Sequence, residues 1–343
     1  MAHLTPRRVA WLAGAAAFTA TAALGLGQDP APTQPPGDYR IVYSGESTSD
    51  LYISDLANPP VQLTRGSATR DQSPDWSADG ASIVFMRMNK KGTDADLWTI
   101  APDGSQLKRI TKGRAFDRNP AWSPDGTQIA FSRRIGRQLS DIWVVNADGT
   151  RPRKLTRTPF TGEVTPAWSP DGKLIAYGRQ SGSRPNVDLW IMRANGRGGK
   201  KLFGTAGYDG EPDFTPDGKF IIFSRESGRI PRNPAPLWKP LRYNLDVWRI
   251  TVKGKTPRRI TRRRGDDYGA RVSPDGTRYV YNVELNCPGR KCNTELFIGT
   301  FGSTATTRLT TRGGLDWGGD WGPPAVVPEP TPEPTPDPVP PVQ

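Results

Sequence analysis

The stretch Pro120-Ala121-Trp122-Ser123-Pro124-Asp125-Gly126 decides the fold, because versions of it recur along most of the chain. Its second half is a tight turn: Pro sets φ at the first central position, Asp suits the second, and Gly occupies the exit that other residues avoid. Further copies lie at residues 74–80, 166–172, 212–218 and, in a weaker form, 271–276. Each copy is therefore expected to end one strand and to begin the next.

The residue that precedes each turn recurs at a nearly constant interval. Successive spacings are 46, 46, 46, 58 and 49 residues, counted through Trp76, Trp122, Trp168, Phe214, Val272 and Trp321. A repeat of this length made of short strands is typical of a propeller blade.

Three more segments follow each turn in a fixed order. An apolar alternation such as residues 128–132 comes first, then an acid before an aliphatic–aromatic pair, as in Asp141-Ile142-Trp143, and then a basic–aliphatic–Thr segment, as in residues 154–156. Alternation with a period of two, rich in β-branched and aromatic residues, predicts strands. The acid–aliphatic–aromatic segment occurs six times, so we predict an all-β, six-bladed β-propeller of four-stranded antiparallel blades over residues 39–322.

The two ends of the repeat region complement each other. The first unit begins at Tyr39 without an inner strand of its own, and the stretch around Trp321 supplies one after the last unit. We therefore expect the C-terminal strand to pair with the N-terminal blade and close the ring, which removes the open seam that a partial ring would leave.

The repeated Pro-Ala-Trp-Ser-Pro-Asp-Gly, the Asp-Ile-Trp segment and the Leu-Thr segment resemble the TolB-type six-bladed β-propeller repeat over residues 39–321. The resemblance implies an extracytoplasmic, protein-binding propeller and does not name the partner. TolB proteins also carry an α/β domain before the propeller. Residues 29–38 are a Pro-rich linker and do not resemble that domain.

The termini suggest export. Arg7 and Arg8 precede an apolar run at residues 9–26, so residues 1–28 are predicted to be a signal peptide, with an uncleaved N-terminal anchor as the alternative. Residues 323–343 are Pro-rich and are expected to be a disordered tail. We expect an extracytoplasmic protein that is periplasmic, cell-wall-associated or secreted.

The reactive side chains are few. Cys287 and Cys292 are the only cysteines, and export favours a disulfide between them. His3 is the only histidine and lies in the signal segment, so a cleaved chain has no imidazole for Ser-His-Asp or Cys-His catalysis. We predict no cofactor, no metal site and no enzymatic activity.

A carboxylate stands five residues before each inner-strand marker, in a chain of net charge +13. We expect these six side chains to surround one mouth of the central channel and to bind a basic partner by focusing the field there. The alternatives are hydrogen bonds to backbone within each loop, or calcium in the channel. The predicted partner-binding residues are Asp71, Asp117, Glu163, Asp209, Asp267 and Asp316.

The loops between second and third strands should open on the same face, and they are rich in cations. The longest lies at residues 225–243 and accounts for the spacing of 58. Long loops in compact domains are often functional, although this one could instead pack its aromatics onto the blade rim. Its predicted contacts are Arg229, Arg232, Trp238, Lys239 and Arg242. The other loop cations are Lys90, Lys91, Arg133, Arg134, Arg137, Arg179, Arg184, Arg290 and Lys291.

These features predict an exported, monomeric, non-enzymatic propeller that binds an envelope protein or peptide over the acidic channel mouth and adjacent loops. The alternative is a propeller that binds carbohydrate or an anionic envelope polymer through its basic outer loops. A hydrolase or lyase that uses channel carboxylates ranks last. We expect no nucleic-acid partner, and membrane contact only through an uncleaved N-terminal segment.

Overall fold

The computed structural model describes residues 39–45, 49–66, 68–136, 138–181, 186–227, 244–263, 265–285, 293–310 and 316–324. These residues form strands and no helix, so the predicted all-β propeller is confirmed. Within them there is accordingly no helix that could cross a membrane. The strands are β1 (Tyr39–Gly45), β2 (Asp50–Ser54), β3 (Val61–Gln62), β4 (Thr69–Trp76), β5 (Ile83–Asn89), β6 (Ala95–Ile100), β7 (Lys108–Arg109), β8 (Ala115–Trp122), β9 (Gln128–Ile135), β10 (Asp141–Asn146), β11 (Arg153–Lys154), β12 (Thr161–Trp168), β13 (Leu174–Ser181), β14 (Asn186–Arg193), β15 (Lys200–Phe203), β16 (Asp209–Phe214), β17 (Phe220–Glu226), β18 (Leu245–Thr251), β19 (Arg258–Arg259), β20 (Asp267–Val272), β21 (Arg278–Leu285), β22 (Asn293–Thr300), β23 (Thr306–Arg308) and β24 (Trp317–Pro324).

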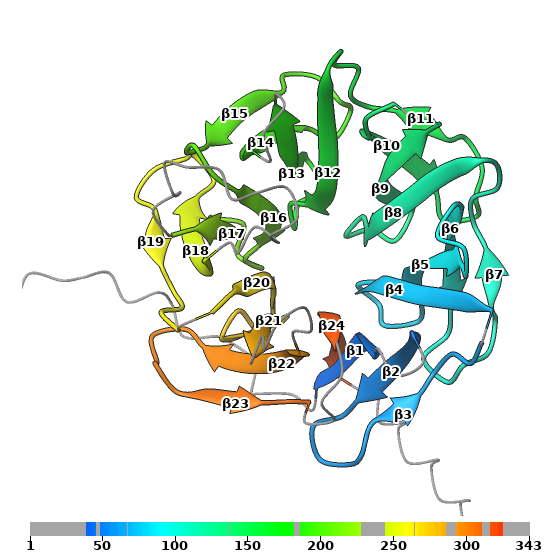
Figure 1. The fold of residues 1–343 in the computed structure, drawn as a ribbon, viewed down its shortest axis with the longest axis horizontal. Coiled ribbons are helices and arrows are strands. Elements are labelled where there is room, and N and C mark those ends of the chain that lie inside the picture. The colour runs from blue at the N-terminus through cyan, green and yellow to red at the C-terminus, as the bar shows by residue number, and fades with distance from the viewer. Residues whose placement is uncertain are drawn as a thin grey trace, which may run out of the picture.

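The strands follow one another around a ring (Figure 1). Four sheets have four strands each: β24-β1-β2-β3, β12 to β15, β16 to β19, and β20 to β23. An eight-stranded sheet holds β4 to β11, and its two halves meet in one parallel pair, Ala95 with Phe116. We number the four-strand repeats one to six from β24-β1-β2-β3, through β4–β7 and β8–β11, to β20–β23.

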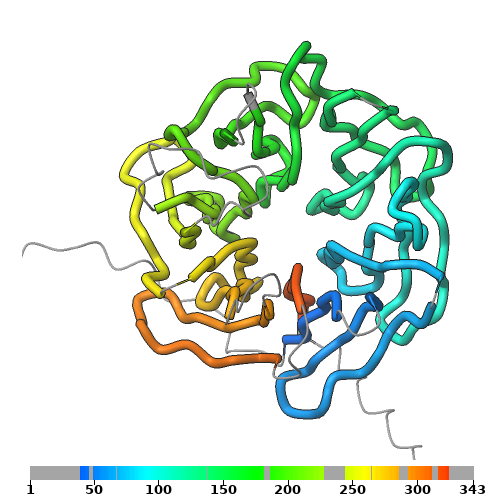
Figure 2. Tube along the Cα trace, viewed as in Figure 1, coloured from blue at the N-terminus to red at the C-terminus, as the bar shows by residue number. Residues whose placement is uncertain are grey.

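The last described strand lies in the sheet of the first one, as the Cα trace also shows (Figure 2). β24 pairs with β1 in antiparallel register, with Trp321 opposite Ile41 and Asp320 opposite Val42. β24 also contacts β4 of repeat two and β21 of repeat six. The inner strands β24, β4, β8, β12, β16 and β20 all begin on one face, which we call the mouth face. Five of them, all but β24, end at the Ser-Pro-Asp-Gly turns or their variants on the opposite face, which we call the turn face.

The core lies between successive repeats. For example, Val84 and Leu97 of repeat two are fully buried in one cluster with Ile129 and Phe131 of repeat three. Such packing excludes water from both faces of each sheet, which is the main driving force for a fold without helices.

The recurring Leu-Thr segment has a structural cause. The Thr111 hydroxyl accepts the N–H of Leu97 at 2.9 Å, and both residues are buried. The same bond recurs in other repeats, where Thr64, Thr156, Thr261 and Thr310 accept the N–H groups of Leu51, Ile142, Val247 and Leu296. A side chain thus satisfies a buried amide that would otherwise destabilise the sheet.

The Ser-Pro-Asp-Gly turns are held in the same way each time. Ser123 donates to Asp125 at 2.6 Å and accepts the N–H of Gln128, and Gly126 takes a φ of 68°. Since a left-handed φ strains residues with a side chain, glycine is needed at this exit.

Candidate functional site

The six predicted mouth carboxylates lie inside the fold. Their exposed fractions are 0 to 7%, so none presents its charge to solvent. The residues are Asp71, Asp117, Glu163, Asp209, Asp267 and Asp316. Their role as partner contacts stays a prediction. In the structure, most of these side chains bond to other residues of the chain.

An arginine from the second strand pairs with four of these carboxylates. Arg133 binds Asp117 through two bonds of 2.7 Å, and Arg87 binds Asp71 with the same geometry. The two bonds fix the guanidinium in the plane of the carboxylate, which makes such pairs strong. The two looser pairs are Arg179 with Glu163 at 3.5 Å and Arg225 with Asp209 at 3.6 Å.

The aromatic residue of the third strand completes this arrangement. The Arg133 guanidinium lies 4.9 Å from the Trp143 ring centre, as cation–π geometry requires. Arg87, Arg179 and Arg225 lie in the same way over Trp98, Trp190 and Trp248. The prediction that Arg133, Arg134 and Arg179 are loop cations is therefore wrong. All three lie within strands, β9 and β13, and the charges of Arg133 and Arg179 are paired.

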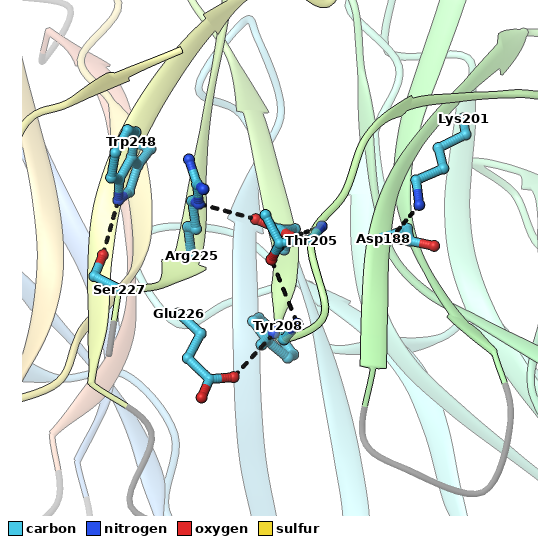
Figure 3. Close-up of polar contacts among 10 residues, drawn as sticks. Asp188, Lys201, Thr205, Tyr208, Arg225, Glu226, Ser227 and Trp248 are labelled. Atoms are coloured by element: carbon cyan, nitrogen blue, oxygen red, sulfur yellow. Dashed lines mark hydrogen bonds and ion pairs between the residues drawn. The ribbon is translucent and has the colours of Figure 1, made fainter. Parts of the chain in front are cut away.

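The charged row continues outward across each sheet. Arg133 is also opposite Asp141 of the third strand, and Asp141 pairs with Lys154 of the outer strand at 2.6 Å. In repeats four and five, Lys201 pairs with Asp188 and Arg259 pairs with Asp246. Figure 3 shows part of this row, with Arg225 and Thr205 on Asp209 and Lys201 beside Asp188. The acidic and basic residues that recur in the sequence thus form one row of alternating charges across the four strands of a sheet, acid–base–acid–base.

Repeats six and one depart from this pattern. Val283 and Gly45 occupy the position of the arginine. In repeat six, Arg263 from the preceding connection lies 4.4 Å from the Phe297 ring centre instead. Burial raises the pKa of Asp267 to about 6.

Exposed apolar side chains gather on the mouth face at repeats three and four. Phe160, just before β12, is 91% exposed. Ile135, the last residue of β9, is 50% exposed, and Leu139, in the connection from β9 to β10, is 48% exposed. The two segments lie against each other, because Leu139 Cβ is 3.6 Å from the place where a Cβ of Gly162 would lie. We call Ile135, Leu139 and Phe160 the apolar patch. No sequence signal singled it out, since each residue is an ordinary apolar residue in a loop or at a strand end.

A small pocket of about 260 Å³ opens on the mouth face where β24 and β1 meet β4. Trp317 at its rim is 37% exposed. The lining residues are Ser44, Ser49, Arg70, Gln72 and Trp317.

A second group of charges lies toward the turn face, at the position just before each inner-strand marker. Asp75 accepts the N–H of Trp122 at 2.7 Å, and Asp213 and Asp320 accept the corresponding N–H groups of Val272 and Trp76 at 2.8 Å. Each of these aspartates therefore connects two neighbouring inner strands. Comparing this position across the repeats would have revealed the group: it reads Asp75, Ala121, Ala167, Asp213, Arg271 and Asp320.

Burial raises the pKa of all three aspartates, that of Asp320 to about 7. The charge of Asp320 adds to this effect on Asp75, while Arg271 opposes it. Among the described residues, no three acidic, histidine or cysteine side chains are placed to hold a metal ion.

Several predicted contacts lie outside the described residues. They are the blade-five loop residues Arg229, Arg232, Trp238, Lys239 and Arg242, the cysteines Cys287 and Cys292, and the loop cations Arg137, Arg184, Arg290 and Lys291.

The comparisons agree with this architecture. Two TolB structures share the fold: putative TolB from Agrobacterium tumefaciens (20% identity, TM-score 0.60, 80% of this chain and 90% of that one) and TolB from Acinetobacter baumannii (18%, 0.66, 84% and 68%). An oligogalacturonate lyase in complex with manganese is also similar (15%, 0.52, 77% and 74%). At these identities the likeness shows the fold alone, and no curated protein matches the chain.

A family model provides the assignment. Residues 31–232, more than half of the chain, match the model of the TolB beta propeller domain. The match includes the Trp-Ser-Pro-Asp-Gly copies that organise the repeats. The chain therefore belongs to the TolB β-propeller domain family.

Proposed function

We propose that this chain is an exported, non-enzymatic propeller of the cell envelope that binds a protein or peptide on its mouth face. The observation that carries the proposal is the apolar patch of Ile135, Leu139 and Phe160. Membership of the TolB propeller family and the export signal predicted at residues 1–28 support the compartment.

Contact between water and an almost fully exposed aromatic side chain is unfavourable, and the free energy of the system falls when a partner covers that side chain. Phe160 is held in that position by a φ of 64°, a conformation that strains residues with a side chain. Strained residues that keep an apolar group in solvent are more often found at binding sites than elsewhere. The patch therefore has the character of a binding hot spot, in which a few aromatic and aliphatic anchors carry most of the affinity.

One of the six mouth carboxylates, Glu163, supports this surface from below. Glu163 follows Phe160 by three residues and accepts bonds from Thr156 and Thr161 at 3.1 and 2.9 Å. Its backbone N–H bonds to the carbonyl of Ser140, next to Leu139, at 2.7 Å. Glu163 thus holds together the two segments that form the apolar patch, and we propose this positioning role for it ahead of direct contact.

Capture from an envelope extract tests the proposal. Full-length protein immobilised through its C-terminus should retain a specific partner, and the double variant Leu139→Ser/Phe160→Ser should lose most of it without a change in unfolding midpoint. The matched control is Val61→Ser, which removes a side chain 69% exposed on outer strand β3 and should capture as the wild type does. Equal capture by the patch variant would refute the mouth-face site.

We propose binding in preference to catalysis, although a lyase is among the structural neighbours. Seven of the described carboxylates nearest the channel are already bonded: four mouth acids to arginine, and three inner aspartates to backbone N–H groups. A groove with free, convergent carboxylates would be needed for glycosidic chemistry.

We further propose that the propeller has six blades, counting the two halves of the eight-stranded sheet separately, and that β24 closes the ring. Packing on the turn face supports this. A Cβ on Gly172 would lie 3.5 Å from Pro124 of the preceding repeat, and a Cβ on Gly80 would collide with Pro323 of β24. Pro323 therefore takes the same place against repeat two that a turn proline takes between other neighbouring repeats.

A further inference from the structure

The pocket at the junction of repeats one and two contains a buried hydroxyl without a partner. Ser44 is 1% exposed, and its Oγ has no hydrogen bond within the described part of the chain. A buried polar atom without a bond in the fold is destabilising, so a hydroxyl in this state beside a pocket is suited to bond a ligand there.

The other repeats show what this position does when its bond is made. Ser132, Ser224 and Asn282 stand at the equivalent place in the second strand. Each accepts a backbone N–H from the next inner strand, at 3.1, 2.9 and 3.0 Å. In these three repeats the polar side chain is therefore bonded within the fold, whereas the Ser44 hydroxyl, which lines the pocket, is not.

The remaining lining groups are hydrogen-bond donors with one positive charge. Arg70 is exposed and makes no ion pair with any described residue, and Ser49 and Gln72 add a hydroxyl and an amide. Asp71, the nearest acid in sequence, is buried under its two bonds to Arg87. Asp316 lies beside Gly45, the neighbour of Ser44 in β1, and successive residues of a strand face opposite sides of the sheet. Asp50, which follows the lining residue Ser49, accepts a bond from Gln62 at 2.9 Å. The described residues that line the pocket therefore carry one positive charge and no negative one, although the sequence suggested an acidic mouth.

The size of the pocket limits its ligand. About 260 Å³ is below the range of sites for drug-sized molecules and accommodates one side chain or one chain end, not a saccharide chain. The Trp317 ring at the rim offers an apolar face to the residue that follows.

We propose that this pocket binds a carboxylate of the partner, either the side chain of an acidic residue or the C-terminal carboxylate of a peptide. The inference rests on the proposed mouth-face function and specifies its chemistry: Arg70 binds the charge, the Ser44 hydroxyl donates the hydrogen bond that it lacks within the fold, and Trp317 contacts the adjacent residue. Arginine and carboxylate match in geometry as well as in charge.

A peptide array distinguishes the two sources of the carboxylate. Full-length protein is applied to heptapeptides of varied sequence made in matched sets, with Glu or Gln at the centre and with a free carboxylate or a carboxamide at the C-terminus. The best set is then titrated in solution by fluorescence anisotropy. We expect the carboxylate member to bind about tenfold more tightly, and the position of that carboxylate identifies the source.

Three variants complete the experiment. Arg70→Gln should abolish the carboxylate preference and Ser44→Ala should reduce it, while Arg193→Gln, an exposed arginine at the turn-face end of β14, should leave it unchanged. Equal binding within each set, or a preference that survives Arg70→Gln, overturns the inference. Peptides that bind through Phe160 without a carboxylate preference leave the proposed function standing, and binding of no peptide at all counts against both.

Discussion

At the scale of single residues, the three inner aspartates are the main surprise. One guanidinium, that of Arg271, is shared by Asp75, Asp213 and Asp320. Burial lowers the pKa of Arg271, the three carboxylates raise it, and the net effect is a raised pKa. Three negative charges around one positive charge cannot all be stable in a buried site, so the pKa values of the acids rise.

The pH dependence of stability follows from Asp320. Its pKa rises from 3.8 when unfolded to about 7 when folded, so the folded state binds the proton more tightly. The resulting stability is fully present below about pH 4 and is lost as the pH rises through 7. In urea unfolding, Asp320→Asn should show a smaller loss of stability between pH 4.5 and 8 than the wild type does.

Asparagine keeps an oxygen that can accept the N–H of Trp76, so the comparison isolates the charge. Parallel pH profiles for the two proteins would contradict the raised pKa. The matched control is Asp125→Asn. The hydrogen bond from Ser123 lowers the pKa of Asp125, so this group affects the pH dependence only below about pH 4, and the variant should keep the wild-type slope between pH 4.5 and 8.

At the scale of elements, the row of alternating charges joins the strands of a repeat beyond their backbone bonds. In repeat three it runs from Asp117 in β8 through Arg133 in β9 and Asp141 in β10 to Lys154 in β11. Each charge in the row offsets the free-energy cost of burying its neighbours. Removal of one charge therefore leaves the next one buried without a compensating partner.

Breaking the row on one side should therefore be costly. The Arg133 side chain is only 12% exposed, and the Asp117→Asn variant removes its negatively charged partner on β8. This change should lower the free energy of unfolding by about 3 kcal/mol. The double variant Asp117→Leu/Arg133→Met should lose less than the sum of its single changes, measured by urea denaturation.

An exposed pair in the next repeat provides the control. Lys173 and Asp171 lie 3.3 Å apart with most of the lysine in solvent, and Lys173→Ala should change stability by less than about 1 kcal/mol. If Asp117→Asn were equally mild, the row would have no structural role and its acids would be free for a partner.

At the scale of the whole molecule, the pairing of the first and last described strands decides whether the ring behaves as one unit. Trp321 is 4% exposed, packs edge-to-face on Tyr39 at 6.1 Å and donates from its indole to the carbonyl of Arg271 at 3.1 Å. One side chain thus contacts both repeat one and repeat six.

Removing that side chain tests the closure. Trp321→Ala should lower the free energy of unfolding by about 3–5 kcal/mol, because it leaves a cavity between repeats. Trp317→Ala in the same strand removes a half-exposed ring and should cost much less. Guanidinium unfolding followed by circular dichroism measures both, and equal small effects would mean that the ring does not depend on β24.

Much of the fold could be predicted from the sequence, because it is written in local, repeated signals. The turn chemistry of residues 123–126, the period of two in the strands and the interval of 46 residues are each visible without neighbours in space. The stretch around Trp321 was recognised as an inner strand because it carries the same marker as the other repeats.

The candidate site could be predicted only in part. The spacing that placed a carboxylate before each inner strand was real, but it could not show that Arg133 lies opposite Asp117, sixteen residues later, with Trp143 behind it. Cross-strand register determines that pairing. The apolar patch and the Ser44 pocket likewise arise from segments that meet only in space.

The sequence by itself determined the architecture of this protein: turns, strand alternation and repeat length are local properties, so a propeller follows from them. Only the tertiary structure decided which charges face solvent. Burial and ion pairing depend on the neighbours that each side chain finds across the sheet. These neighbours pair four of the mouth acids with arginine and leave Phe160, Trp317 and Arg70 exposed.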